Sequence, residues 1–145
     1  MTSHSKIILV DTREKQPYEF VGLQTITKKL CIGDYSTIAD DPSIVERKSA
    51  NDYIHTIFHE KKRFHKELVL LRNTKRPCIV VEGSFATLRR SIDLYHPMIS
   101  IESVMKITVA IVEKYCIPVY LCGNRMEAEE FTKHYLLSDY PSIKK

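Results

Sequence analysis

The feature that most constrains this chain is the stretch of residues 33–52, in which two short extended segments flank an acidic turn. Residues 39–43 read Ala-Asp-Asp-Pro-Ser, a composition typical of a hairpin turn. Because the side chains of a strand alternate between its faces, Glu46 and Lys48 share one face. The hairpin brings Asp34 back towards Glu46. The stretch therefore predicts two carboxylates and one ammonium group around a common point, a grouping that can hold a divalent cation and activate a water.

Apolar runs and capping residues predict the rest of the architecture. Residues 6–11 form an apolar run that ends in Asp11, which is typical of a buried strand with its carboxylate at the exposed end. The sequence predicts one α/β domain over residues 1–145, with residues 1–5 disordered, strands first, and helices alternating with strands later. Further strands are expected over residues 21–30, 78–82 and 118–121, and helices after Ser49, over residues 61–71, and after Ser84, Ser100 and Asn124.

Composition narrows the class of protein. The net charge of +4 and the pI near 8.8 are compatible with a nucleic-acid partner. No apolar run approaches the length of a membrane span, and no signal-peptide core follows the polar N-terminus, so we expect no membrane partner. An intracellular location is expected, cytoplasmic or nucleoid if the source is a prokaryote or a phage. The four cysteines form no C-x-x-C pair and are predicted to be reduced core thiols, not a disulfide framework.

Three ordered motifs resemble the signature of XPF-type (XPF/MUS family) nucleases. They are Val-Asp-Thr-Arg-Glu at residues 10–14, Gly-Asp-Tyr at residues 33–35, and Glu46-Arg-Lys followed by Asp52. Nucleases of this type are structure-specific DNA endonucleases of the PD-(D/E)xK superfamily. The likeness is strong over the first third of the chain and extends weakly to residues 81–83. It implies an α/β, restriction-endonuclease-like fold, with a central mixed β-sheet flanked by helices.

The resemblance also implies a cofactor and its ligands. Asp34 and Glu46 would ligate Mg²⁺ or Mn²⁺, together with the backbone carbonyl of Arg47. Asp11 would lie beside them, directly or through a metal-bound water, and Glu14 would support that edge of the site. A hard, small cation takes oxygen ligands and keeps several waters, so a few carboxylates are enough to hold it.

Three further positions of the signature carry different expectations. Lys48 would position the attacking water or stabilise negative charge on the phosphate, and the sequence leaves a base and an electrostatic role both open. Arg47 points away from Glu46 and Lys48 on a strand, which favours a structural salt bridge or a DNA contact. Asp52 has capping-box spacing from Ser49, so a structural role is expected for it. Glu82, at a strand end, is also expected to be structural.

Basic and aromatic residues outside the signature are candidates for DNA contact. The basic run that opens the second predicted helix is either a solvated face or a phosphate-contacting patch. Tyr18 and Phe20 are candidates for stacking on bases. His55 and His59 have helical chelate spacing but lack a third ligand, which argues against zinc. The basic residues expected at DNA are Arg13, Lys15, Lys61, Lys62, Arg63 and Lys66.

The function these features predict is hydrolysis of DNA phosphodiester bonds by a Mg²⁺-dependent endonuclease, in DNA repair, recombination or replication. By resemblance, branched, flapped or junction DNA is the expected substrate, and a water would attack in line to leave a 5′ phosphate. A non-catalytic DNA-structure-binding scaffold of the same fold and a junction resolvase or defence nuclease are the alternatives.

The sequence motifs do not indicate which surface recognises the structure of the DNA. Eukaryotic members of the family carry helix-hairpin-helix modules after the nuclease domain, and no such module is found in residues 1–145. The nuclease surface, a homodimer or a separate DNA-targeting protein is therefore expected to supply it. Residues 101–112 or 131–137 are the predicted dimer face.

Overall fold

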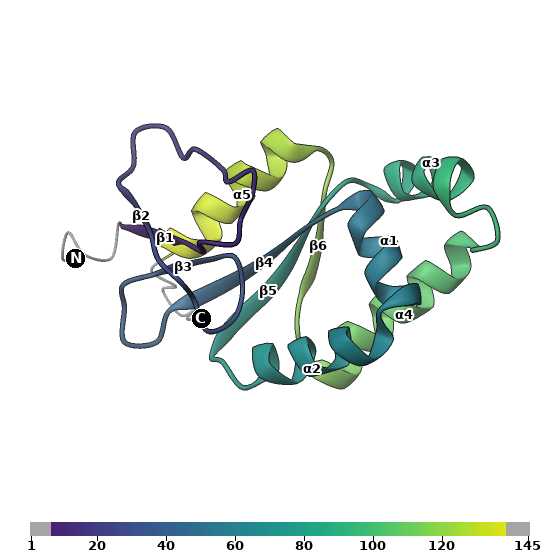
Figure 1. The fold of residues 1–145 in the computed structure, drawn as a ribbon, viewed down its shortest axis with the longest axis horizontal. Helices are drawn as coiled ribbons and strands as arrows, with labels where there is room; N and C mark the ends of the chain where they lie inside the picture. The colour runs from purple at the N-terminus through teal and green to yellow at the C-terminus, as the bar shows by residue number, and fades with distance from the viewer. Residues whose placement is uncertain (1–6, 139–145) are drawn as a thin grey trace, which may run out of the picture.

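The predicted hairpin lies at the centre of a six-stranded mixed sheet in the computed structural model, which describes residues 7–138 (Figure 1). The strand order is β2-β1-β3-β4-β5-β6. The pairs β1–β3 and β3–β4 are antiparallel, whereas β1–β2, β4–β5 and β5–β6 are parallel. The strands are β1 (Ile8–Val10), β2 (Thr25–Thr27), β3 (Tyr35–Thr37), β4 (Ser43–Ser49), β5 (Arg76–Glu82) and β6 (Val119–Cys122).

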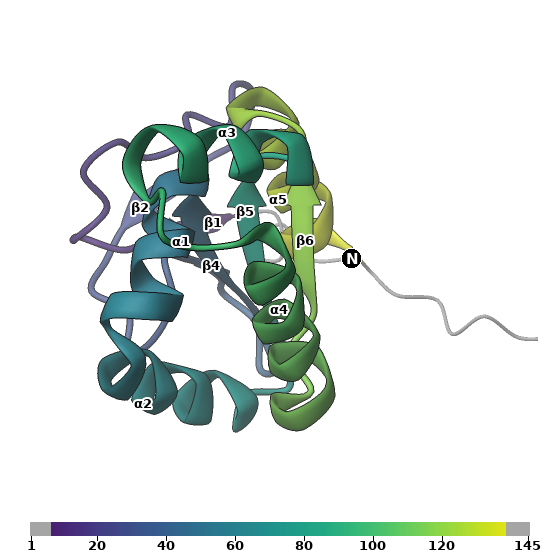
Figure 2. The same cartoon turned by 90° about the vertical axis from the view of Figure 1, so that its right-hand side faces the viewer.

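Helices cover both faces of the sheet. Figure 2 shows α1, α2 and α4 in front of β4, β5 and β6, and α5 lies behind the sheet in that view. The side chains of β5 alternate between the two faces, and each face has its own hydrophobic cluster. Ile79 and Val81 pack towards α1–α4, and Cys78 and Val80 pack towards α5. The helices are α1 (Ala50–His59), α2 (Lys61–Arg72), α3 (Phe85–Tyr95), α4 (Ile101–Tyr115) and α5 (Arg125–Leu137).

The predicted capping residues begin four of these helices. Ser49 accepts a hydrogen bond from the backbone N–H of Asp52 at 3.1 Å. Ser84 and Thr87 form a reciprocal capping box at the start of α3. Ser100 and Asn124 cap α4 and α5 through the backbone N–H three residues further on. Each side chain satisfies an N–H group that the helix leaves without an internal partner, and the predicted helix starts are confirmed.

The chain before the hairpin differs from the sequence prediction. The strand predicted over residues 21–30 is wrong in extent, because only Thr25–Thr27 pairs with β1 and all three of its residues are exposed. The segment before it turns instead, with Phe20 and Gly22 both at positive φ. The predicted disorder of residues 1–5 lies outside the described residues.

The expectation of four core thiols is also wrong for two of the cysteines. Cys78 is buried and Cys122 half-buried, but Cys31 and Cys116 are exposed, and all four are free. Cys31 belongs to the loop between β2 and β3, and Cys116 ends α4 in a left-handed conformation, so neither side chain continues the apolar run beside it. No helix within residues 7–138 has the length and apolar character that a membrane crossing requires.

Gly33, directly before Asp34, is a sensitive position for the hairpin. Its φ is +81°, and a Cβ there would overlap Cγ2 of Ile44. We expect Gly33→Ala to lower the free energy of unfolding by about 2–4 kcal/mol, as strain at positive φ adds to the overlap. Gly22→Ala is the matched control, because Gly22 has a φ of +87° with open space around it. Urea unfolding would contradict this account if both variants lost the same stability.

Candidate active site

Backbone hydrogen bonds hold the ends of three strands together at one edge of the sheet. The N–H of Asp34 donates to the carbonyl of Val45 at 2.9 Å, and the N–H of Asp11 donates to the carbonyl of Asp34 at 2.9 Å. The Asp34 side chain completes the arrangement, since its Oδ2 accepts the N–H of Arg47 at 2.7 Å. The structure therefore brings Asp34 beside Glu46, as predicted from the hairpin, and places Asp11 next to them, as the resemblance implied.

A pocket of about 330 Å³ opens at this edge, between the strand ends and α2. Four carboxylates line it: Asp11, Asp34 and Glu46 from the sheet, and Glu67 from α2. The remaining lining residues are Arg13, Cys31, Ile32, Gly33 and Leu70. A pocket rich in carboxylate oxygens is suited to a hard divalent cation.

Lys48 lies on the same face of β4 as Glu46. Its Nζ donates to Oε2 of Glu46 at 3.0 Å, and both side chains are largely buried. The same Nζ lies 5.5 Å from the centre of the Phe64 ring. Burial alone would lower the pKa of Lys48, but the charge and hydrogen bond of Glu46 outweigh it and raise that pKa. Lys48 is therefore an ammonium group at neutral pH in this arrangement.

Asp34 is the group most affected by the crowding of carboxylates. Burial, followed by the negative charge of Glu46, raises the pKa of Asp34 to about 8, although the hydrogen bond from the N–H of Arg47 opposes the shift. A nearby divalent cation would reverse this effect by favouring the ionised form.

Asp11 is held in a different way. Burial raises the pKa of Asp11, but hydrogen bonds from Arg13 and from the N–H of Leu30 outweigh that effect and keep this pKa below its usual value. Nε of Arg13 lies 2.7 Å from Oδ2 of Asp11. Asp11 is thus directed to Arg13, and Glu46 is directed to Lys48. In this arrangement, no group of three or more Asp, Glu, His or Cys side chains within residues 7–138 is placed to hold a metal ion.

Arg47 lies on the opposite face of β4, as predicted for a structural residue. Its guanidinium donates to Glu14 at 2.7 and 3.0 Å and to Glu82 at 3.1 Å. The hydroxyl of Tyr35 also donates to Glu14, at 2.7 Å. Glu14 therefore does not line the pocket, and its connection to the pocket runs through Arg47. The structural role expected of Glu82 agrees with this arrangement.

The expectation that Tyr18 and Phe20 stack on bases is wrong, because both side chains are buried. The ring of Tyr18 stacks on that of Tyr35 with 5.2 Å between centroids, and Phe20 meets Tyr35 edge-on. The hydroxyl of Tyr18 donates to Glu82 at 2.5 Å. These aromatic rings secure the loop between β1 and β2 against the sheet and are closed to DNA.

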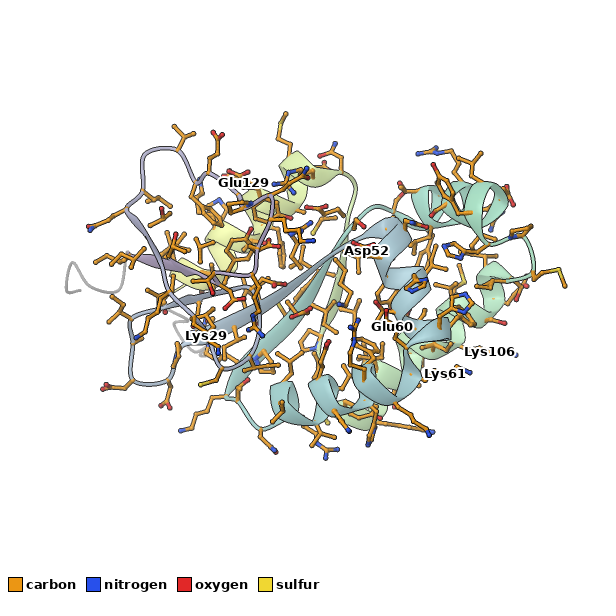
Figure 3. All side chains as sticks on the ribbon, viewed as in Figure 1. Lys29, Asp52, Glu60, Lys61, Lys106 and Glu129 are labelled. Carbon is orange, nitrogen blue, oxygen red and sulfur yellow. The ribbon has the colours of Figure 1, made fainter. Side chains whose placement is uncertain are left out.

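The remaining predicted residues lie outside the pocket. Asp52 is exposed in the first turn of α1, and Lys61 lies beyond the other end of that helix (Figure 3). The basic residues of α2 are exposed, and Arg63 forms ion pairs with Glu60 and Glu67. Lys15 is exposed in the loop after β1.

Glu67 is a pocket residue that the sequence analysis missed. It follows Phe64 by three residues and precedes Leu71 by four, so it belongs to the apolar stripe of α2. A carboxylate at the edge of the apolar stripe of a helix was the available signal, because such a position brings a charge to the side of the helix that packs on the protein.

The chain resembles known proteins over most of its length. Residues 10–135 match the family defined by the ERCC4 domain. Over 89 residues the chain is 35% identical to the 3′-flap repair endonuclease Xpf of Saccharolobus solfataricus, an alignment that covers 57% of this chain and 36% of that protein. The chain thus spans about a third of the length of this curated relative.

Solved structures of XPF from Aeropyrum pernix share the fold. One has a TM-score of 0.72 at 24% identity and covers 96% of this chain and 64% of its own. A second, in complex with DNA, has a TM-score of 0.67 at 24% identity and covers 97% of this chain and 68% of its own. The predicted α/β, restriction-endonuclease-like fold with a central mixed sheet is confirmed, and so is the resemblance to XPF-type nucleases.

The raised pKa of Asp34 predicts how stability depends on pH without metal. The folded state holds a proton on Asp34 up to about pH 8, whereas an unfolded aspartate releases it near 3.8. This contribution to stability is complete below pH 3.8 and is lost as the pH rises towards 8. In EDTA, the Tm of the wild type should therefore fall between pH 5.5 and pH 8.5, and the Tm of Asp34→Asn should fall less. Each kcal/mol of stability lost by the wild type lowers its Tm by roughly 3–6 °C.

The exposed helical residue Asp93 supplies the control for this titration. Asp93→Asn should reproduce the pH dependence of the wild type in scanning calorimetry. Parallel Tm curves for the wild type and Asp34→Asn would show that Asp34 is not the group whose protonation stabilises the metal-free fold.

Proposed function

Because the chain belongs to the ERCC4 domain family, we propose that it is a divalent-metal-dependent DNA endonuclease. The observation that carries the proposal is the pocket at the sheet edge, where Asp34 and Glu46 lie together with the Lys48 ammonium beside them. A phosphodiester bond needs a positioned water and compensation of developing charge, and these groups are suited to supply both.

The residues of the pocket fit Mg²⁺ or Mn²⁺. All candidate side-chain ligands are oxygens, and one carboxylate oxygen of Glu67 is buried without a hydrogen-bond partner. Burial and then the negative charge of Glu46 raise the pKa of Asp34, and a cation would offset both effects. We assign the cation to Asp34, Glu46 and the backbone carbonyl of Arg47, with Asp11 beside them. When bound, the cation would lower the pKa of a coordinated water and offset charge on the phosphate.

Lys48 is assigned an electrostatic role. Its pKa is raised by Glu46, so a proton remains on Nζ at neutral pH and the group is a poor base. A fixed ammonium beside the pocket would instead stabilise the negative charge that develops on the phosphate oxygens. Arg47 and Glu14 would act by holding β4 in register, and Asp52 by its place in the first turn of α1.

The basic surface near the pocket would position DNA by its phosphates. Arg13 is 62% exposed even though it pairs with Asp11, so it can reach a phosphate at the mouth of the pocket. The exposed residues of α2 would extend this contact, because surface lysines and arginines release counterions when they neutralise phosphates. The proposed phosphate contacts are Arg13, Lys15, Lys61, Lys62, Arg63 and Lys66.

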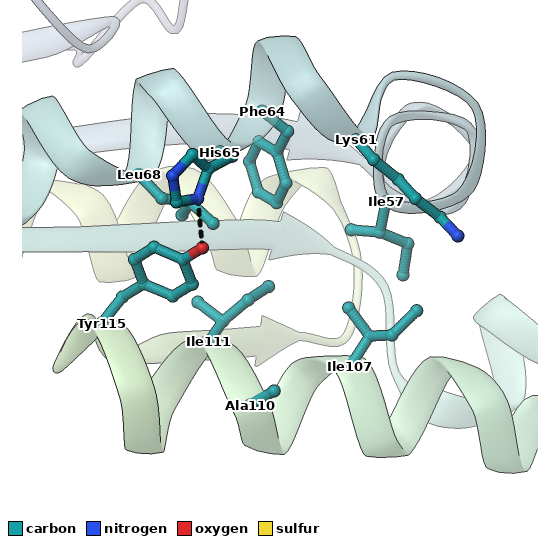
Figure 4. Close-up of a pocket in the computed structure, with 9 residues that line it drawn as sticks. All are labelled: Ile57, Lys61, Phe64, His65, Leu68, Ile107, Ala110, Ile111 and Tyr115. Carbon is teal, nitrogen blue, oxygen red and sulfur yellow. Dashed lines mark hydrogen bonds between the residues drawn. The ribbon is translucent and has the colours of Figure 1, made fainter.

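A homodimer through α4 would enlarge the surface offered to branched or flapped DNA. Val109 and Val112 are 57% and 43% exposed on α4, whereas the alternative segment in α5 contains the buried Leu136. Beside this face, an apolar pocket of about 310 Å³ lies between α2 and α4 (Figure 4). Sedimentation of the wild type as a monomer at micromolar concentration would rule this dimer out and leave the nuclease surface or a separate DNA-targeting protein to recognise the DNA structure.

Cleavage of end-labelled DNA tests the proposed activity. The substrates are single strands, duplex, 3′ flap, 5′ flap, splayed fork and four-way junction, each with Mg²⁺, Mn²⁺ or EDTA. We expect metal-dependent cutting that is best on branched or flapped DNA, and a loss of about 10²-fold or more in Asp34→Asn and in Lys48→Ala. The preferred substrate separates a flap nuclease from a junction resolvase or a defence nuclease.

The control for this experiment is Asp93→Asn, which removes an exposed carboxylate of α3 and should cut like the wild type. Equal residual cutting in all variants would indicate a contaminating nuclease. Binding of branched DNA without metal-dependent cutting would contradict the proposed activity and support a DNA-structure-binding scaffold.

A further inference from the structure

We propose that Glu67 is a fourth carboxylate of the cation site, so that divalent-metal binding ties α2 to the sheet edge. The inference rests on the function proposed above and adds a residue from a separate helix. None of the three signature motifs of this sequence contains Glu67, which lies fifteen residues after the last of them, at Asp52.

The side chain of Glu67 lies at the same pocket as the proposed metal ligands. Glu67 lines the same pocket as Asp34 and Glu46, but from α2 rather than from the sheet. Its side chain is 31% exposed, so it lies at the wall of the pocket rather than in the hydrophobic cluster beneath. On the helix side Glu67 and Leu70 line the pocket, whereas the neighbouring residues Phe64, Leu68 and Leu71 are apolar and buried.

One carboxylate oxygen of Glu67 lacks a hydrogen-bond partner. Oε2 of Glu67 is shielded from solvent and has no hydrogen-bond partner within the described residues. The other oxygen, Oε1, lies 4.0 Å from Nε of Arg63, a long and mostly exposed ion pair. A buried carboxylate oxygen without a donor is costly, and a bound cation or one of its waters would remove that cost.

Negative charge exceeds positive charge inside the pocket. The Lys48 ammonium donates to Glu46, and no hydrogen bond or ion pair joins it to Glu67 among the contacts of residues 7–138. The four carboxylates of the pocket therefore have two close cations, since Arg13 pairs with Asp11, and Glu67 has only its 4.0 Å ion pair with Arg63. A divalent cation would supply the positive charge that these carboxylates lack.

The consequence concerns DNA as well as metal. The helix that supplies Glu67 begins with the exposed basic residues Lys61 and Lys62, and Arg63 bridges Glu60 and Glu67. A cation held from both β4 and α2 would fix the distance between the proposed phosphate contacts and the reacting pocket. Metal binding would in this way order the DNA-contacting helix against the site.

Mn²⁺ binding without DNA tests the inference apart from activity. Free Mn²⁺ is followed by electron paramagnetic resonance during titration of the wild type and of Glu67→Gln. We expect the Kd of Glu67→Gln to be higher by about 10-fold, because a ligand or a partner of a bound water is lost. In calorimetry, Mn²⁺ should raise the Tm of Glu67→Gln less than that of the wild type, while in EDTA the variant should be at least as stable.

Glu60→Gln is the matched control. Glu60 also forms an ion pair with Arg63, but it does not line the pocket. Its substitution should leave the Kd for Mn²⁺ unchanged. If Glu67→Gln does not fold, Glu67→Asp replaces it, since the shorter side chain withdraws the carboxylate from the pocket and the Kd should again rise.

The outcomes separate this inference from the proposed function. A wild type that binds no Mn²⁺ would overturn the metal site as a whole. A wild type that binds Mn²⁺ with the same Kd as the Glu67 variants would overturn the role of Glu67 and leave the proposed function standing. A Glu67→Gln protein that is less stable than the wild type in EDTA, with unchanged Kd, would make Glu67 a structural residue.

Discussion

The register of β4 is the constraint on which the site depends. Because strand side chains alternate, Glu46 and Lys48 enter the pocket while Arg47 enters the opposite face and meets Glu14 and Glu82. A slip of one residue would exchange the two sets and place a guanidinium among the carboxylates. The hydrogen bond from the N–H of Arg47 to Asp34 and the ion pairs of its side chain hold that register from both sides.

Carboxylates are fully paired on one face of β4 and crowded on the other. On the Arg47 face each buried carboxylate has a cation or hydroxyl as partner, so the network is closed and supports the fold. In the pocket the carboxylates outnumber their partners, and burial together with the negative charge of Glu46 raises the pKa of Asp34. Such an imbalance destabilises the metal-free protein and is typical of sites built for a charged ligand. The ion-pair network on the Arg47 face therefore holds β4 in place against the repulsion between carboxylates on the pocket face.

Local chemistry explains why much of this was predictable from the sequence. The turn at residues 39–43, the alternation around Arg47 and the caps at Ser49 and Asn124 depend on near neighbours in the chain, and the structure has them as expected. Tyr18 and Glu67 depend on distant elements. Tyr18 is a core residue because Tyr35 and Glu82 lie beside it, and Glu67 meets the pocket because α2 crosses the strand ends. Contacts between residues so far apart in the chain cannot be predicted from the spacing of residues in the sequence.

The most direct measurement of the central claim is anomalous diffraction at the manganese edge from crystals grown with Mn²⁺. The account predicts a peak within coordination distance of Asp34 and Glu46, with Lys48 beside it and Arg47 directed to the opposite face. A peak elsewhere, for example at the histidines of α1, or no peak in the pocket at saturating Mn²⁺, would contradict the claim that this edge of the sheet is a divalent-cation site.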